Sequence, residues 1–231
     1  MKVSRLALLP FFAALPIVGC GSSNEAQVDE ARAKGVAQQM VTAVTQARTS
    51  KNGQGAAFAI AGAGQQAQGI IAPTAEGQSA LTTGTAQQAD TSGTATCTDT
   101  GCTFTSYTDS ATGSSWTIDG TESWSASKFD CDLTMTGNAS GFTWNFHEVA
   151  ALSVSDTSID GTLTTDGSYD MSIPGVGSGS YTWNSTLTFK AVKFNGTGCP
   201  TSGSIEVQAS VDAGAGSYDG SGTVTFDGSG C

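Results

Sequence analysis

A regular alternation of apolar and polar residues begins near Cys97 and continues almost to the end of the chain. In residues 129–135, Phe, Cys, Leu and Met alternate with Asp and Thr, and the pattern returns in residues 142–154, 159–173, 181–191, 205–211 and 218–226. Side chains of a strand point alternately to its two faces. Each segment therefore has one apolar and one polar face, which is typical of antiparallel strands covered on one side.

The alternating segments predict a mainly β fold, an antiparallel meander of about eight to ten strands joined mostly by hairpins. A flat sheet of this size would expose a wide apolar face. We therefore expect the meander to curl into a barrel or to split into a sandwich, with the curled sheet preferred. One N-terminal helix precedes it and is expected to plug one end or cover an edge.

The dipeptide Asp-Gly is a hairpin signal, and it occurs at Asp119, Asp160, Asp166, Asp219 and Asp227. A three-residue loop at residues 166–168 would keep Leu163 and Met171 on the apolar face, so we expect a hairpin there. A two-residue turn at Asp160 would instead place Ile159 and Leu163 on opposite faces of the sheet. At Asp160, and at Asp119, we instead predict bent strands in which the glycine marks a bulge.

The segment before the β domain is divided by composition. Residues 25–48 have apolar residues at three- to five-residue steps, which predicts a helix that Asn24 can cap. Residues 51–95 are rich in Gly, Ala, Gln and Thr with few large apolar groups, so we expect a partly disordered linker, with one short helical turn possible at residues 56–61. The β domain is expected to span residues 96–231.

The N-terminus has the features of an export signal. Lys2 and Arg5 precede an apolar run at residues 6–18, and Gly19 supplies a small residue before the cleavage point. Thirteen residues make about 20 Å of helix, which is too short for a hydrocarbon core of roughly 30 Å. The run is therefore expected to be removed rather than to span a membrane.

The sequence Ile17-Val18-Gly19-Cys20 resembles the lipobox of bacterial lipoproteins. The resemblance implies that residues 1–19 are a signal peptide and that Cys20 is the acylated first residue of the mature chain, followed by a tether and the helix in residues 20–50. It also implies the membrane as a partner through the lipid. Because Gly21 stands in place of aspartate, the same resemblance implies the outer membrane, with the periplasmic or extracellular face left open.

The charge of the chain argues against several partners. Its formal net charge is −11 at pH 7, and residues 52–127 contain no lysine or arginine. Binding to nucleic acid or to anionic lipid headgroups requires clustered cations. Both are disfavoured, so membrane attachment is expected to come from the lipid, which needs two or more acyl chains to be durable.

Five cysteines follow Cys20, and in an oxidising compartment they predict two disulfides and one thiol. A bridge between Cys199 and Cys231 would fix the C-terminus. The second bridge joins two of Cys97, Cys102 and Cys131, and the sequence leaves the choice open. With one histidine in the chain, we expect no metal site and no cofactor.

Catalytic signals are weak. His147 is the only histidine, and no Gly-x-Ser-x-Gly motif occurs, so we expect a solvated surface histidine. Carboxylates are too common for their number to indicate a glycosidase, and turn chemistry explains the Asp-Gly pairs without calcium. Glu148 has the parity of its apolar neighbours, so it either faces inward or is turned outward by a bulge. We predict that the protein is not an enzyme.

The four tryptophans, Trp116, Trp124, Trp144 and Trp183, are expected mainly in the core, although exposed rings could stack on sugars. The predicted function is a lipid-anchored envelope lipoprotein whose β domain is a non-catalytic binding or structural module for an apolar or glycan ligand. One alternative is a carrier of a lipid or other apolar molecule in a barrel cavity. An alternative of another class is a hydrolase of envelope polysaccharide.

Overall fold

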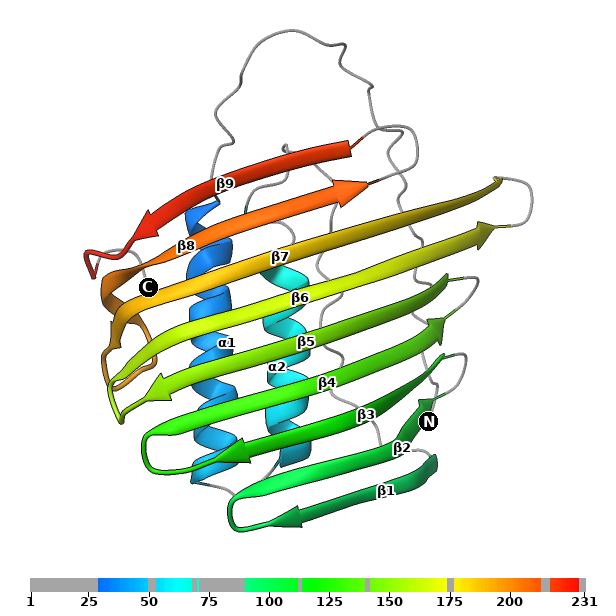
Figure 1. Cartoon of the computed structure of the whole chain (residues 1–231), viewed down its shortest axis with the longest axis horizontal. Coiled ribbons are helices and arrows are strands. Elements are labelled where there is room, and N and C mark those ends of the chain that lie inside the picture. The colour runs from blue at the N-terminus through cyan, green and yellow to red at the C-terminus, as the bar shows by residue number, and fades with distance from the viewer. Residues whose placement is uncertain are drawn as a thin grey trace, which may run out of the picture.

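A computed structural model of the chain describes residues 29–49, 53–67, 70, 90–111, 114–139, 142–173, 177–212 and 217–228. Two helices precede nine strands within these residues (Figure 1). Cys20 with the rest of the predicted lipobox, the predicted cap Asn24, and Cys231 all lie outside them.

The nine strands form one sheet in which they follow each other in chain order, each antiparallel to the next. They are β1 (Asp90–Thr98), β2 (Gly101–Ala111), β3 (Ser114–Trp124), β4 (Lys128–Ala139), β5 (Phe142–Val154), β6 (Ser158–Ile173), β7 (Gly177–Phe194), β8 (Pro200–Asp212) and β9 (Ser217–Thr225). The predicted mainly β antiparallel meander is confirmed. The sheet is not closed, however, and β1 and β9 form its two edges (Figure 1).

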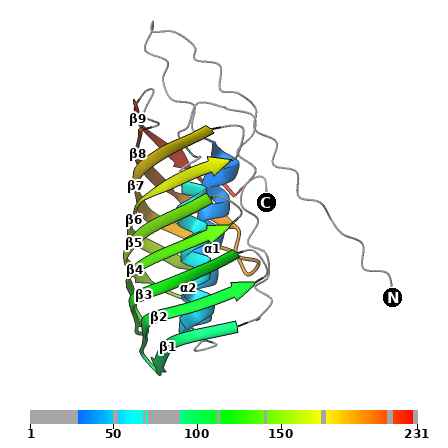
Figure 2. The same ribbon diagram turned by 90° about the vertical axis from the view of Figure 1, so that its right-hand side faces the viewer.

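Two helices, rather than curling of the sheet, cover the apolar face. Helices α1 (Glu30–Arg48) and α2 (Gly53–Ala67) lie side by side against one face, and both cross the strands (Figures 1 and 2). Because the helices bury the apolar side chains of this face, the sheet does not have to close into a barrel or pack against a second sheet. The helices cover the face of the sheet, not one end or edge as we expected.

Helix α1 begins five residues later than the predicted start at residue 25. Asp29 is its N-cap, and the Oδ1 atom of Asp29 accepts a hydrogen bond of 3.0 Å from the backbone N–H of Arg32. Its buried face consists of Ala33, Val36, Ala37, Met40, Ala43, Val44 and Ala47. None of the described helices is long and apolar enough to cross a membrane.

Helix α2 lies inside the segment that the sequence predicts as a linker. Most of its residues are glycine and alanine, and Ile60 is a large buried side chain among them. The helical turn that the sequence allows at residues 56–61 is part of this longer helix, whose full extent was missed because the prediction counted large apolar groups. Small residues stabilise a helix in another way, since they let its backbone approach the sheet closely and bury the face beneath it.

The Asp-Gly pairs at Asp119 and Asp160 lie within strands, as predicted, but the bulges expected there are in the neighbouring strands. The pairing of β6 with β7 shifts register between Ile159 and Gly161, and the Oδ2 atom of Asp160 accepts the N–H of Ala191 at 2.9 Å. Asp119 lies within β3 and its Oδ1 atom accepts the N–H of Ser106 at 2.6 Å. In both places the extra residue is in the partner strand, β7 opposite Asp160 and β2 opposite Asp119. Ser106 and Ala191 both have positive φ angles, of 45° and 47°. Each aspartate thus stabilises an irregular residue of the neighbouring strand.

The hairpin expected at residues 166–168 is not formed. These residues lie in the middle of the continuous strand β6, where Gly167 pairs with Phe146 on β5 and with Trp183 on β7. The Trp183 ring occupies the space that a side chain at Gly167 would fill. Packing requires glycine at this position. The Asp-Gly dipeptide alone does not show whether its glycine is required by packing or by a turn.

Candidate functional site: a pocket at the turns and a buried polar cluster

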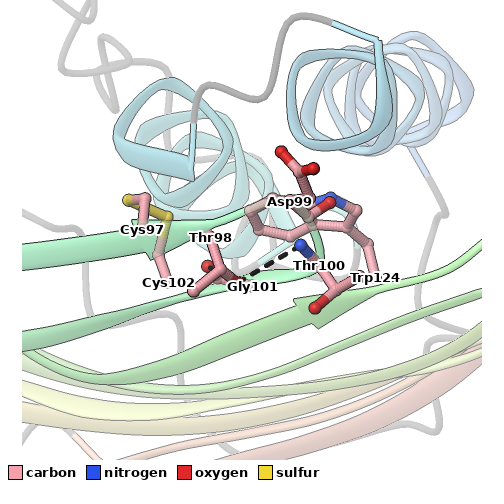
Figure 3. The surroundings of a disulfide bond; sticks show 7 residues. All are labelled: Cys97, Thr98, Asp99, Thr100, Gly101, Cys102 and Trp124. Carbon is pink, nitrogen blue, oxygen red and sulfur yellow. Dashed lines mark hydrogen bonds between the residues drawn. A yellow bond between two sulfur atoms is a disulfide. The ribbon is translucent and has the colours of Figure 1, made fainter.

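The hairpin of β1 and β2 is closed by a disulfide between Cys97 and Cys102, which face each other across the two strands (Figure 3). This decides the pairing that the sequence left open, and Cys131 is a buried free thiol. Cys199 is also disulfide-bonded, while its predicted partner Cys231 lies outside the described residues. The Cys97–Cys102 bridge closes the turn at the end of the edge strand β1.

The turn between these cysteines is held against Trp124, at the end of β3. The indole Nε1–H of Trp124 donates to the Asp99 carbonyl at 2.9 Å, and its backbone N–H donates to the Thr100 carbonyl at 2.8 Å. Figure 3 shows the Trp124 ring beside this turn. A buried ring with a satisfied N–H and a disulfide together fix the position of a turn that would otherwise be free at a sheet edge.

A pocket of about 560 Å³ lies between the C-terminal half of α1 and the turns β1–β2, β3–β4 and β5–β6. We call it the turn-edge pocket. Its apolar lining is formed by Val41, Val44, Trp124, Ile159 and Phe194, and its polar lining includes Thr45, Arg48, Asp99, Ser125, Ser155 and Asp156. Most of its lining residues are polar, so the pocket suits a ligand with several hydrogen-bonding groups better than an apolar one.

Arg48 is the one cation among the described residues that line the turn-edge pocket. Its Nη2 atom lies 3.6 Å from Oδ1 of Asp156, whose side chain is 95% exposed. An ion pair with such an exposed partner is weak. The Asp156 carboxylate is therefore accessible to a ligand as an acceptor, while the Arg48 side chain, which is 20% exposed, can donate from the wall of the pocket.

Neither this pocket nor Arg48 is indicated by a pattern in the sequence. The polar groups of the pocket come from one helix and three separate turns, and each residue alone has the composition of an ordinary turn or surface. Their proximity depends on α1 crossing the strands near the turns, which local patterns do not encode.

A buried polar cluster lies elsewhere on the same face, beneath α2. Its members are Glu122 on β3, Cys131 on β4, Glu148 on β5, Thr165 on β6 and Ser185 on β7. Glu122 pairs with Cys131, and Glu148, Thr165 and Ser185 pair in a row across three strands. Within the described part of the chain, the side-chain oxygens of Glu122, Glu148, Thr165 and Ser185 have no hydrogen-bond partner.

Burial controls the protonation of this cluster. Glu122 is 2% exposed and Glu148 is fully buried, and removal from water raises the pKa of each carboxyl from 4.5 to about 8. Burial, followed by the proximity of Glu148, also raises the pKa of the Cys131 thiol. Glu148 thus faces inward, one of its two predicted orientations. Glu122 was missed, although it shares the parity of the buried Ile118 and Trp124.

Aromatic side chains pack together on β5, β6 and β7. Trp144 stacks on Phe146 with ring centroids 4.9 Å apart, and Tyr169 stacks on Trp183 at 4.8 Å. Trp124 and Trp183 are buried, as expected of core residues, whereas Trp116 and Trp144 are half-buried. Most of the other ring pairs are tilted or edge-on, which is the geometry of core packing rather than of a coplanar platform.

His147 lies on the polar face of β5, opposite to its neighbour Glu148. Its Nε2 atom is 2.9 Å from Oδ1 of Asp132 and its Nδ1 atom is 3.2 Å from Oδ1 of Asp166. The hydrogen bond to Asp132 is the main cause that raises the pKa of this histidine. Because both ring nitrogens face carboxylates, the protonated form of the ring is favoured. A protonated histidine cannot act as a general base.

The described residues contain no group of three or more His, Cys, Asp or Glu side chains arranged to hold a metal ion. No protein family model, no curated protein and no solved structure matches the chain.

Proposed function

We propose that the chain is an exported lipoprotein of the bacterial outer membrane, anchored through an acylated Cys20, whose sheet domain is a non-catalytic binding module. Asp29 follows Cys20 by nine residues. A fully extended tether of that length reaches about 30 Å, so the anchor would keep α1 close to the bilayer. The lipobox motif supports the anchor, and the turn-edge pocket supports the binding role.

The ligand that fits the turn-edge pocket best is a neutral sugar unit. A sugar ring has an apolar C–H face, which suits the lining of Val44, Trp124 and Ile159, and a rim of hydroxyl groups. The polar lining offers carboxylates and serine hydroxyls as acceptors and the Arg48 guanidinium as a donor. The net charge of −11 disfavours an anionic polymer. The composition of this pocket is the observation that carries the proposal.

The binding role is favoured over catalysis by the location of the perturbed carboxyls. A glycosidase needs a carboxyl with a raised pKa next to its substrate. The two carboxyls with this property, Glu122 and Glu148, lie beneath α2 and are not among the residues that line the turn-edge pocket. The open sheet likewise offers no barrel interior for an enclosed apolar ligand.

Binding can be tested by isothermal titration calorimetry and by amide NMR shifts, with N-acetylglucosamine, glucose and their oligomers as probes. We expect shifts at the three turns and at the end of α1. Loss of one hydrogen bond to a charged group in Arg48→Gln or Asp156→Ala should weaken binding about tenfold. Asp130→Asn, an exposed aspartate on the opposite face, is the control. Absence of binding, or binding that neither variant weakens, would refute the sugar proposal.

Two further measurements test the rest of the proposal. Labelling with a palmitate analogue should mark the wild-type chain and not Cys20→Ser, and equal labelling would refute the anchor. Chromatography of the oligomers after incubation should show no shortening, since cleavage would indicate a hydrolase. A lipid retained in native mass spectrometry of protein from its host would favour the carrier.

A further inference from the structure

Helix α2 meets the sheet through two glycines. A side-chain methyl group at Gly53 would overlap the sulfur of Cys102 and lie 3.2 Å from Oε2 of Glu122. A methyl group at Gly64 would overlap Oε1 of Glu148 and lie 2.8 Å from Oγ1 of Thr165. The two glycines are about three helical turns apart and so face the same way. Their separation of about 16 Å corresponds to some three strand spacings of about 4.8 Å.

The helix backbone therefore lies directly on two carboxyl groups that have no hydrogen-bond partner among the described residues. Such a group is tolerable when it is neutral, whereas an ionised and unpaired carboxylate away from water costs several kcal/mol. Burial is the cause that raises the pKa of both carboxyls, and within the described part of the chain no cation counteracts it.

The charged groups near this contact are few. The titratable group between the two carboxyls is the thiol of Cys131, whose own pKa is raised. Helix α2 contains no charged residue. The cations of the adjacent helix α1 are in ion pairs, Arg32 with Asp29, Lys34 with Glu30 and Arg48 with Asp156.

We infer that α2 is a pH-sensitive cover, which lies on the sheet while the carboxyls of Glu122 and Glu148 are uncharged and separates from it as they ionise. A carboxyl whose pKa is higher beneath α2 than in water favours the covered state at low pH. That preference is complete below about pH 4.5, decreases as the pH rises, and is lost above about pH 8. Opening exposes the Cys131 thiol and the apolar face of the central strands.

Hydrogen exchange of the α2 amides in the full chain tests the inference, with rates measured from pH 5 to pH 8 and corrected for the intrinsic pH dependence of exchange. We expect the opening of α2 to increase about tenfold per pH unit for each carboxyl that becomes solvated. The double variant Glu122→Gln/Glu148→Gln should show no such dependence. Glu206→Gln, a glutamate on the opposite face that pairs with Lys190, should behave like the wild type.

The same pH dependence in the double variant, or none in the wild type, would overturn the inference. A second measurement does not depend on the folding of the variant. The infrared carbonyl band of a protonated carboxyl should persist in the wild type at pH 6, where exposed glutamates are ionised. Its absence at that pH would also overturn the inference. In a Cys20→Ser chain, alkylation of Cys131 should accelerate with α2 opening, and Cys131→Ser provides the blank.

Discussion

The turn-edge pocket and the buried polar cluster lie on the same face of one sheet, but they differ in whether their polar groups have hydrogen-bond partners. Beside the pocket, the Trp124 indole donates to a backbone carbonyl and a disulfide closes the adjoining turn. Beneath α2, the oxygens of Glu122 and Glu148 have no partner within the described chain. Satisfied groups give a fixed shape, which suits binding. Unsatisfied groups weaken the contact that covers them, which suits a change of conformation.

The largest effect expected from this comparison is a gain in stability when the buried carboxyl is removed. A pKa raised from 4.5 to about 8 corresponds to at most ~5 kcal/mol of lost stability at alkaline pH. Glu148→Leu should therefore raise the free energy of unfolding at pH 8 by about 2–4 kcal/mol, as apolar replacement of buried charges often does. Urea unfolding at pH 5 and pH 8 measures this, and the gain should be smaller at pH 5.

The control for that measurement is Glu206→Leu, since the Glu206 side chain on the opposite face is 45% exposed and leaves no buried charge to relieve. A loss of stability in Glu148→Leu at pH 8 would show that the Glu148 carboxyl has a stabilising partner. The contrast between the two regions would then disappear.

Removal of the disulfide beside the pocket is the next largest effect. For a loop as short as that between Cys97 and Cys102, loss of the cross-link should lower the free energy of unfolding by about 2 kcal/mol. The double variant Cys97→Ser/Cys102→Ser should show this in urea unfolding, together with faster hydrogen exchange at Asp99 and Thr100. Reduction should destabilise the wild type more than the double variant, which keeps the disulfide of Cys199 but lacks this one. Unchanged exchange at the turn would mean that Trp124 alone fixes it.

The hydrogen bond of Trp124 is a smaller contribution at the same place. Trp124→Phe retains an aromatic ring but removes the donor to the Asp99 carbonyl. We expect a loss of about 1 kcal/mol in the free energy of unfolding, because the carbonyl belongs to an exposed turn and can bind water instead. Trp183→Phe is the matched comparison, since the Nε1 atom of Trp183 is unpartnered in the described chain and should contribute less. An equal loss in both variants would show that ring size, not hydrogen bonding, matters.

The sequence predicts much of this fold because period-two alternation directly reports which side chains face the core. It predicted the antiparallel strands, although with a hairpin inside β6 that is not formed, the parity that Glu148 follows and the helix that became α1. It did not predict α2, because a helix of small residues is recognised by what it packs on, and that sheet is distant in the chain. Closure was predicted wrongly for the same reason, since two helices already cover the apolar face.

The two candidate sites were predicted unequally. Of the buried polar cluster, the sequence analysis named only Glu148 and left its direction open, although Glu122 also has the parity of its apolar neighbours. The turn-edge pocket does not follow from parity, because Arg48, Asp99 and Asp156 come from separate elements whose proximity depends on where α1 crosses the strands. The disulfide choice required register, since Cys97 and Cys102 become partners only once β1 and β2 pair.

The smallest effect concerns His147, one residue before Glu148 but on the solvent side. The hydrogen bond to Asp132, and then that to Asp166, raise the pKa of His147 above 6.5. Its stabilising contribution is therefore complete below pH 6.5 and is lost as the pH rises through the pKa of the folded state. Because the side chain is 41% exposed, we expect little change in overall stability.

As the only histidine in the chain, His147 gives an unambiguous NMR titration. Asp132→Asn should return its pKa toward 6.5, whereas Asp130→Asn should not. A pKa unmoved by Asp132→Asn would mean that solvent screens this pair, and only the buried side of β5 would then carry a strong electrostatic effect.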